Sequence, residues 1–279
     1  MRILMFGRTG QVATEIQRMT EVNALGREAA DLSDPRACAA IVTASDADVV
    51  INAAAYTAVD RAEDEEELAT IINGDAPAAI AAAAAAKGVP FLHISTDYVF
   101  SGEGDTPGQP EDPTNPLGAY GRSKLKGELG IRAVGGEFVV LRTSWVFSAH
   151  GKNFVKTMLR LAGEAEEIGV VSDQVGGPTA AADIANALLH IAEALHAGKG
   201  RPGIYHMAGA PDVSWAEFAG EIFRLSGRAV RVRPIASSDY PMPARRPANS
   251  RLDCRSLEHT YGLRRPDWRE GLRKVIDEL

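Results

Sequence analysis

Tyr120 and Lys124 form the most informative pair of residues in this sequence. Four residues apart on a helix, their side chains share one face, so the lysine ammonium can approach the tyrosine phenol. A phenol with an ordinary pKa of about 10 exchanges protons poorly at neutral pH unless a cation stabilises the phenolate. The pair therefore predicts a tyrosine that donates a proton, although Tyr-x-x-x-Lys also occurs by chance on helix surfaces.

Thr96 is expected to supply a hydroxyl group for the same reaction. It lies in Ser95-Thr96-Asp97-Tyr98, directly after the apolar run 89–94, which we interpret as a strand. A hydroxyl there can hydrogen-bond a carbonyl oxygen while Tyr120 delivers its proton, which prepares the carbonyl carbon for a hydride. The alternative is that Thr96 only caps the end of the strand.

Gly7 and Gly10 follow an apolar run and open a helix, with the spacing Gly-x-x-Gly-x-x-Ala. Two glycines allow a tight turn, and the helix N-terminus offers free N–H groups and a positive dipole end to a pyrophosphate. A tight turn without a ligand would have the same spacing. The position between a strand and a helix favours dinucleotide binding.

Arg27 lies where a dinucleotide fold selects its cofactor, about 20 residues after the glycines. A guanidinium there pairs with the 2′-phosphate of NADPH, which an acid would repel. NADPH is therefore the preferred cofactor. The alternative is that Arg27 is an ordinary solvated arginine in a loop. Glu28 would allow NADH as the cofactor if its side chain, rather than that of Arg27, points inward.

These residues need a scaffold, and short apolar runs alternate with Ala- and Leu-rich stretches through the first half of the chain. This alternation predicts an α/β fold, a Rossmann-type doubly wound parallel sheet. Strands are expected at 2–6, 22–25, 48–54, 89–94 and 137–146, with ligands beyond their carboxyl ends. We expect a dinucleotide-binding domain over 1–150, with 179–206 returning to it, and a smaller substrate-binding lobe mainly from 151–279.

Composition excludes several other classes of protein. The chain has 279 residues with a net charge of −7, so no positive field attracts nucleic acid. No apolar stretch approaches the roughly 20 residues that cross a bilayer, and the N-terminus does not resemble a secretion signal, which predicts a cytoplasmic protein. Two cysteines and six isolated histidines predict neither a disulfide framework nor a metal site.

Several segments, taken together and in order, resemble the dTDP-4-dehydrorhamnose reductases, a family of extended short-chain dehydrogenase/reductases. They are residues 7–12, 52–60, 95–100, Tyr120 with Lys124, 141–146 and 245–250. The resemblance covers nearly the whole chain. It implies NAD(P)H-dependent reduction of the 4-keto group of dTDP-4-dehydro-L-rhamnose to dTDP-L-rhamnose, the last step of dTDP-rhamnose biosynthesis.

The resemblance also implies residue roles. Tyr120 would be the proton donor, Lys124 its electrostatic partner and a ligand of the nicotinamide ribose, and Thr96 would hold the reacting oxygen. The implied cofactor contacts are Gly10, Gln11 and Val12 at the phosphates, Asp31 and Leu32 at the adenine, and Ala55, Tyr56 and Thr57 at the ribose and nicotinamide. Asp97 and Trp145 would contact the sugar.

Arg246 is a further candidate, because the adjacent guanidinium groups of Arg245 and Arg246 can grip a pyrophosphate; an ordinary basic surface loop is the alternative. Some relatives bind Mg²⁺ through glutamates at a dimer contact, where Glu15 could serve, but a single exposed glutamate is usually solvated. The sequence does not support a metal by ligand spacing and leaves a homodimer open.

Two other functions are weighed against reduction. A sugar-nucleotide dehydratase or epimerase is the first, and related dehydratases have Thr-Asp-Glu where this chain has Thr96-Asp97-Tyr98. The second is a non-catalytic, cofactor-binding regulatory subunit, similar to the partner of methionine adenosyltransferase. Such a subunit needs no proton donor, so the presence of Thr96, Tyr120 and Lys124 favours an enzyme.

Overall fold

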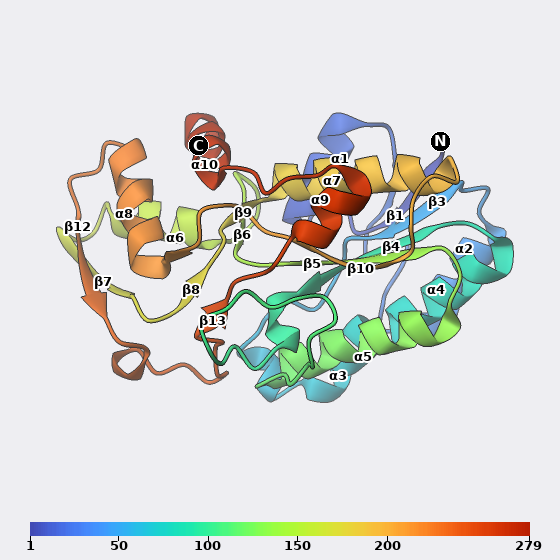
Figure 1. Cartoon of the computed structure of the whole chain (residues 1–279), viewed down its shortest axis with the longest axis horizontal. Helices are drawn as coiled ribbons and strands as arrows, with labels where there is room; N and C mark the ends of the chain where they lie inside the picture. The colour runs from blue at the N-terminus through green and yellow to red at the C-terminus, as the bar shows by residue number, and fades with distance from the viewer.

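Six parallel strands form the central sheet, in the order β10-β5-β4-β3-β1-β2 (Figure 1). They are β1 (Ile3–Phe6), β2 (Asn23–Leu25), β3 (Val49–Asn52), β4 (Phe91–Thr96), β5 (Phe138–Thr143) and β10 (Gly203–Met207). The computed structural model describes all 279 residues. Residues of β1, β3, β4 and β5 are almost all buried, as expected for a parallel sheet covered on both faces.

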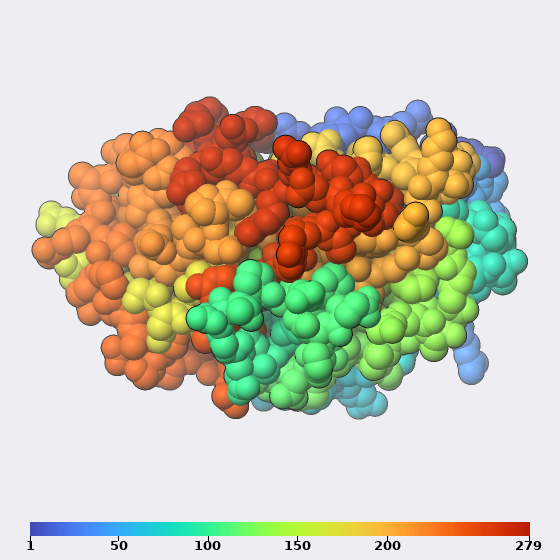
Figure 2. Space-filling model, in the orientation of Figure 1, coloured from blue at the N-terminus to red at the C-terminus, as the bar shows by residue number.

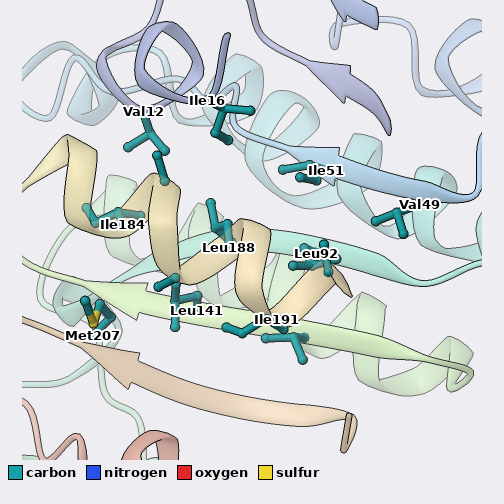
Figure 3. Packing of buried hydrophobic residues seen from close by; sticks show 14 of the residues in the cluster. Val12, Ile16, Val49, Ile51, Leu92, Leu141, Ile184, Leu188, Ile191 and Met207 are labelled. Carbon is teal, nitrogen blue, oxygen red and sulfur yellow. The ribbon is translucent and has the colours of Figure 1, made fainter. Parts of the chain in front are cut away.

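Helices cover both faces of this sheet, which confirms the predicted doubly wound fold. One layer contains α1 (Gln11–Met19), α7 (Ala181–His196) and α9 (Arg255–Tyr261), and the other contains α2 (Pro35–Ala44), α4 (Ala76–Lys87) and α5 (Ala119–Val134). Figure 3 shows the first layer, where Val12 and Leu188 face the apolar strand residues Ile51 and Leu141. Burial of these apolar faces holds the strands in register and fixes their carboxyl ends along one edge.

One helical stretch corrects a sequence expectation. Helix α3 (Glu66–Thr70), the π-helical turn η2 (Ile71–Asp75) and α4 follow one another without a break. Over Glu66–Lys87 this stretch is long and apolar enough to cross a membrane by length and composition, with a mean hydropathy of 1.3. Half of it is buried inside the protein, where α4 packs against α2 and α5, as in a core helix.

The C-terminal part of the chain builds a second cluster around its own apolar core (Figure 1). Its helices are α6 (Phe154–Leu161), α8 (Trp215–Leu225) and α10 (Trp268–Glu278). Its strands are β6 (Val146–Phe147), β7 (Glu167–Val171), β8 (Val175–Gly176), β9 (Thr179–Ala180), β11 (Val213–Ser214), β12 (Arg231–Ile235) and β13 (Asn249–Ser250). Helix α7 and strand β10 lie outside this cluster, against the main sheet.

The loop after β4 joins the two parts. Backbone hydrogen bonds connect Gly102 to Asn249, and Gly108 to Arg251 and Asp253. Figure 2 shows this loop, in green, against the C-terminal segment on the surface. The irregular loop that the sequence predicts after β4 therefore connects the main sheet to the segment that contains β13.

Two elements differ from the sequence expectations. The expected strand 137–146 ends at Thr143, because Trp145 takes the left-handed conformation with φ 48° and the chain then turns into β6. Helix α9 was not expected, and its seven residues are held by Leu257 and Tyr261, which pack into the core beside α7. Both features depend on contacts between distant segments rather than on local sequence pattern.

Helix α5 packs so closely on η2 that a side chain at Gly127 has no room. A Cβ atom there would lie 2.2 Å from the carbonyl oxygen of Asn73. We expect Gly127→Ala to lower the free energy of unfolding by about 1–3 kcal/mol, measured by urea denaturation. Gly220→Ala on α8 is the matched control, since nothing lies within 4 Å of its Cβ. The control should gain about 0.5–1 kcal/mol, and equal effects at both sites would contradict the packing argument.

Candidate active site

Thr96 and Tyr120 meet at the carboxyl edge of the sheet. Thr96 is the last residue of β4, and Tyr120 lies in the first turn of α5. The Thr96 hydroxyl donates to Asp97 Oδ1 at 3.1 Å and accepts from the Tyr98 backbone N–H at 3.2 Å. Thr96 therefore does cap the strand end, and its hydroxyl also acts to lower the pKa of the Tyr120 phenol.

The net pKa of Tyr120 is nevertheless raised, first by burial and then by the charge of Asp97. Lys124 is not among the groups that act on it. The Lys124 ammonium lies 3.0 Å from His93 Nε2 and donates to the Ile94 carbonyl at 2.7 Å, and no hydrogen bond joins it to Tyr120. The lysine-acidified phenol expected from the spacing is therefore not seen in this arrangement, although both side chains belong to α5 as predicted.

Asp97 is a buried carboxyl group at the centre of this site. Only 3% of its surface is exposed, and its Oδ2 atom has no hydrogen-bond partner. Burial raises the pKa of Asp97 to about 6, although hydrogen bonds from Ser250 and Thr96 oppose the shift. A buried acceptor without a partner is costly, so this oxygen has the capacity to accept a hydrogen bond from a ligand.

Trp145 closes the site from the side of the second cluster. Its left-handed backbone costs about 1–2 kcal/mol for a residue with a Cβ, and stacking on Trp215 offsets this cost. The two indole rings are 3.6 Å apart between centroids and 12° from parallel. A Cβ at Gly176 would lie 2.9 Å from both Trp145 Cε2 and Ser250 Cβ, so the Trp145 ring reaches the neighbourhood of Ser250.

Arg246 attaches the C-terminal loop to the Rossmann part. Its guanidinium donates to Asp60 Oδ2 at 2.8 Å and to the Tyr98 hydroxyl at 3.4 Å. Asp60 also accepts from the Ala244 backbone N–H at 3.2 Å. The sequence showed no acid near Arg246, and the fold supplies one from a segment far away in the chain.

The glycine turn has the geometry that a dinucleotide requires. Gly7 has a φ of +111°, and a Cβ there would lie 3.1 Å from the Ala53 carbonyl carbon. Gly10 caps α1 without any side-chain hydrogen bond, and the first turn carries no acidic residue. The N–H groups at this helix end are therefore available to an anion, so the residues present fit the pyrophosphate of a dinucleotide cofactor.

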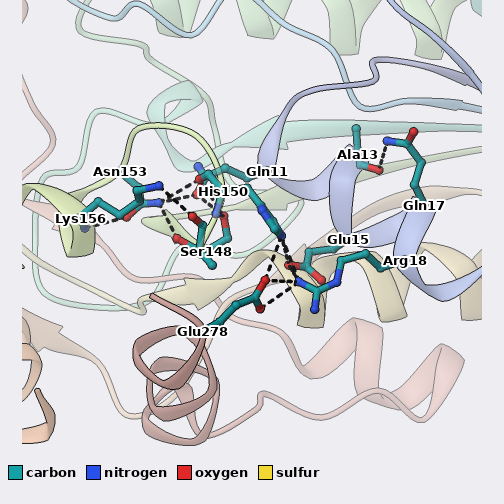
Figure 4. A network of polar contacts seen from close by, with 11 residues as sticks. Gln11, Ala13, Glu15, Gln17, Arg18, Ser148, His150, Asn153, Lys156 and Glu278 are labelled. Atoms are coloured by element: carbon teal, nitrogen blue, oxygen red, sulfur yellow. Dashed lines mark hydrogen bonds and ion pairs between the residues drawn. The ribbon is translucent and has the colours of Figure 1, made fainter.

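Gln11 and its neighbours connect this turn to the second cluster (Figure 4). Gln11 Oε1 accepts from the Ser148 hydroxyl at 2.9 Å and from Asn153 Nδ2 at 3.0 Å. Because phosphate oxygens accept hydrogen bonds and Oε1 is occupied, any contact of Gln11 with the cofactor phosphates would come from its Nε2 amide or its backbone N–H. Two turns further along α1, Arg18 pairs with Glu278 at 2.7 Å.

Glu15, the candidate metal ligand, lies in the same network. Its carboxylate contacts His150 Nε2 at 3.1 Å and Arg18 at 3.5 Å, and its side chain is largely buried (Figure 4). The structure contains no group of three or more potential ligands that could hold a metal ion. The nearest partners of Glu15 are thus a cation and an imidazole.

The predicted adenine end is open to solvent. Arg27 is exposed and lies 3.4 Å from Asp31, whereas Glu28 pairs with Arg8 at 2.8 Å. A backbone hydrogen bond from Ser33 lowers the pKa of Asp31. The Leu32 side chain faces the core, so its contact with an adenine would be through the backbone.

Asn73, which the sequence analysis did not single out, binds the segment expected to border the nicotinamide. Its amide accepts from the Tyr56 backbone N–H at 2.8 Å and donates to the Tyr56 carbonyl at 3.0 Å. It also donates to the Ser123 hydroxyl at 3.0 Å, which in turn donates to the Tyr120 carbonyl at 2.7 Å. The segment Ala55-Tyr56-Thr57 is thereby tied to the helix that carries Tyr120 and Lys124.

A glycine turn shaped for a dinucleotide, at the edge of a sheet that also carries Thr96 and Tyr120, defines a Rossmann-type oxidoreductase. A family model described as the RmlD substrate binding domain matches residues 1–279. A dTDP-4-dehydrorhamnose reductase from Burkholderia thailandensis is 46% identical over 296 residues, which cover 100% of this chain and 99% of the relative. The chain belongs to the dTDP-4-dehydrorhamnose reductase family.

Solved structures agree with this assignment. A dTDP-4-dehydrorhamnose reductase from Clostridium acetobutylicum superposes with a TM-score of 0.93 at 38% identity. The same enzyme from Bacillus anthracis, in complex with NADP, has a TM-score of 0.92 at 32% identity. Each comparison covers 100% of this chain and 99% of the other. A relative with the same fold as this chain therefore binds NADP.

The stacked tryptophan pair gives a spectroscopic test of the site geometry. The chain has three tryptophans, and only Trp145 and Trp215 stack on each other. We expect an exciton couplet in the far-UV circular dichroism spectrum that Trp215→Phe abolishes, because the couplet arises from coupling between two indole rings in close contact. Trp268→Phe is the matched control and should keep the couplet. A couplet that survives Trp215→Phe would contradict the stacking.

Proposed function

We propose that this protein reduces the 4-keto group of dTDP-4-dehydro-L-rhamnose to give dTDP-L-rhamnose, with NADPH as the preferred reductant. The observation that carries this proposal is the meeting of Thr96 and Tyr120 beside the unpartnered carboxyl oxygen of Asp97. It brings an acid and a hydroxyl group together at the carboxyl edge of the sheet.

The cofactor would be held by elements already described. The turn from Gly7 to Gly10 and the N-terminus of α1, with Gln11 and Val12, would bind the pyrophosphate, and Arg27 would pair with a 2′-phosphate. Ala55, Tyr56 and Thr57 would border the nicotinamide ribose. When bound, the reduced cofactor supplies the hydride, and the protein supplies orientation and protons.

Tyr120 would donate the proton to the substrate oxygen. Because burial raises the pKa of Tyr120, the phenol stays protonated at neutral pH and is available as an acid. Thr96 would hydrogen-bond the same oxygen and draw charge towards it. Lys124, one helical turn away, would stabilise the tyrosinate that remains after the transfer.

The sugar nucleotide would lie between the two parts of the molecule. Asp97 and Ser250 would hydrogen-bond sugar hydroxyl groups, Trp145 would cover the sugar ring, and Arg246 would bind the pyrophosphate if its pair with Asp60 opens. On this basis we divide the chain into a dinucleotide-binding domain, 1–150 with 179–206, and a substrate lobe drawn mainly from 151–279. Since sugar nucleotides and NADPH are cytoplasmic metabolites, we place the enzyme there.

Reduction is favoured over dehydration by the residue after Asp97. Tyr98 occupies the position of the second acid in dehydratases, and its hydroxyl accepts a hydrogen bond from Arg246. Burial raises the pKa of Tyr98, so this phenol is a weaker acid than a carboxyl group and a poor group for expelling water. A single proton donor suffices for reduction.

Replacing the proton donor tests this function. We expect Tyr120→Phe to lower kcat about a hundredfold or more, because only the hydroxyl proton is lost, with NADPH affinity unchanged. Turnover is followed as NADPH oxidation with dTDP-4-dehydro-L-rhamnose, and NMR identifies the product. Tyr205 lies on β10, away from the site, and its hydroxyl donates to the Arg201 carbonyl. Tyr205→Phe removes this hydroxyl and should keep normal turnover. Normal turnover in Tyr120→Phe would refute the assignment.

Cofactor choice is tested at Arg27. We expect Arg27→Gln to weaken NADPH binding about tenfold and to leave NADH binding unchanged, since only NADPH offers a 2′-phosphate. Fluorescence titration of each nucleotide measures this difference. Arg132→Gln, at the exposed far end of α5, is the control for loss of one positive charge. Equal losses for both nucleotides would show that Arg27 does not read the phosphate.

A further inference from the structure

His93 is a fully buried histidine that the mechanism above leaves without a role. It lies in the middle of β4, between Asn52 of the neighbouring strand β3 and Lys124 of α5. Its Nδ1 atom is 3.2 Å from Asn52 Nδ2, and its Nε2 atom is 3.0 Å from Lys124 Nζ. All three side chains are at most 2% exposed, so water does not reach between them.

The orientation of Asn52 decides which nitrogen of His93 carries the proton. Asn52 Oδ1 accepts from the Ala54 backbone N–H at 3.1 Å, so the amide must turn its NH₂ group towards His93. An NH₂ group only donates, and His93 Nδ1 therefore accepts. Burial and the nearby Lys124 lower the pKa of His93 well below its ordinary value, so the ring is neutral and its one proton is on Nε2.

This tautomer presents a donor to Lys124. An ammonium group has three donors and no acceptor, so it would place a donor against the Nε2–H. A neutral amine has a lone pair that accepts from Nε2–H and still donates to the Ile94 carbonyl at 2.7 Å. Each contact in the series Asn52–His93–Lys124 therefore pairs a donor with an acceptor only when Lys124 is a neutral amine.

We propose that His93 is a positioning residue that stabilises the neutral amine of Lys124, which allows Lys124 to return a proton to Tyr120 after each turnover. The role rests on the function proposed above. In this step an N–H bond of the Lys124 ammonium breaks and the O–H bond of Tyr120 forms through a bridging water, which cancels both charges. The amine then accepts from His93 and regains a proton from solvent.

The other groups around Lys124 are consistent with this role. Glu128, one turn further on α5, is the only charged group that raises the pKa of Lys124, and Arg142 and Ser95 already bind its carboxylate. On the η2 side, the buried amide of Asn73 binds Tyr56 and Ser123. Burial dominates and lowers the pKa of Lys124 to about 8, where proton exchange near neutral pH is easy.

The protonation of Lys124 can be measured without substrate, by NMR titration of lysine-labelled protein with Lys124→Arg to assign the signal. Because His93→Leu removes the donor that stabilises the amine, we expect the Lys124 titration to move upward by about one pH unit, tenfold in the proton equilibrium. A shift downward would show that His93 accepts from the ammonium, and no shift would show that it has no influence. Either result overturns the proposal.

His93→Gln is the rescue variant. Its carbonyl can accept from Asn52 while its NH₂ group donates to Lys124, so the Lys124 titration should stay within a few tenths of a pH unit of the original. Phe91→Leu, which changes the buried strand neighbour that stacks on His93, controls for altered packing and should leave the titration in place. A shift in Phe91→Leu as large as in His93→Leu would contradict a specific role.

Kinetics separate this role from a merely structural one. In His93→Leu we expect the rate of a single turnover to stay within about twofold, because Tyr120 begins protonated, while steady-state turnover falls about tenfold and its pH profile shifts. Equal loss in both would overturn the proposal. If no dTDP-4-keto sugar is reduced, the proposed function fails, and the NMR titration still decides how His93 acts on Lys124.

Discussion

The buried side chain of Asn73 joins the three segments that meet at the site. It binds both backbone groups of Tyr56 and the hydroxyl of Ser123, which in turn holds the carbonyl of Tyr120. Asn73 can reach all of them because it lies in a π-helical turn pressed against Gly127 of α5. This hydrogen-bonded contact adds to the packing of Tyr56 and Tyr120 against a shared cluster of buried alanines and fixes the loop after β3 relative to α5.

Burial, rather than charge pairing, sets the proton chemistry of the site. It raises the pKa values of Tyr120 and Asp97 and lowers that of Lys124, so all three groups are shifted towards their neutral forms. For Asp97, a folded-state pKa of about 6 lies above the unfolded value, so ionisation lowers stability as the pH rises from about 4 to 6. The cost above that range is on the order of 3 kcal/mol. A site built this way holds protons ready for transfer and attracts partners that would satisfy its buried groups.

The sequence predicts the parts of this site that depend on local rules. Gly7 and Gly10 require a turn between a strand and a helix, Thr96 follows an apolar run, and Asp34 caps α2 through a hydrogen bond to the Ala37 N–H. Each of these features is set by residues within one or two turns of the chain. The fold class then places the glycine turn and Thr96 at the carboxyl edge of the parallel sheet.

The missing parts are those that distant segments impose. Nothing near Trp145 predicts its left-handed backbone, because the stabilising ring is Trp215 on α8. In the sequence His93 looks like an ordinary strand residue, and only the fold places it between Asn52 and Lys124. The acid that pairs with Arg246 is Asp60, which belongs to a distant segment. The i, i+4 spacing placed Lys124 on the right helix, but His93 and the Ile94 carbonyl, both non-local, decide where its ammonium goes.

Contacts between the two parts of the molecule also bear on how substrate binding and catalysis are linked. The Ser250 hydroxyl of the C-terminal segment acts to lower the pKa of Asp97 in the main part, and Gln11 at the glycine turn binds Ser148 and Asn153. The glycine turn and the Asp97 site, proposed to bind the cofactor and the sugar, therefore both contact segments of the C-terminal part of the chain. A ligand that strengthens one set of contacts restricts the position of that cluster, and this restriction lowers the conformational entropy that the second ligand must remove. Binding of cofactor and sugar nucleotide should thus be coupled through the interface itself, without any rearrangement of the central sheet.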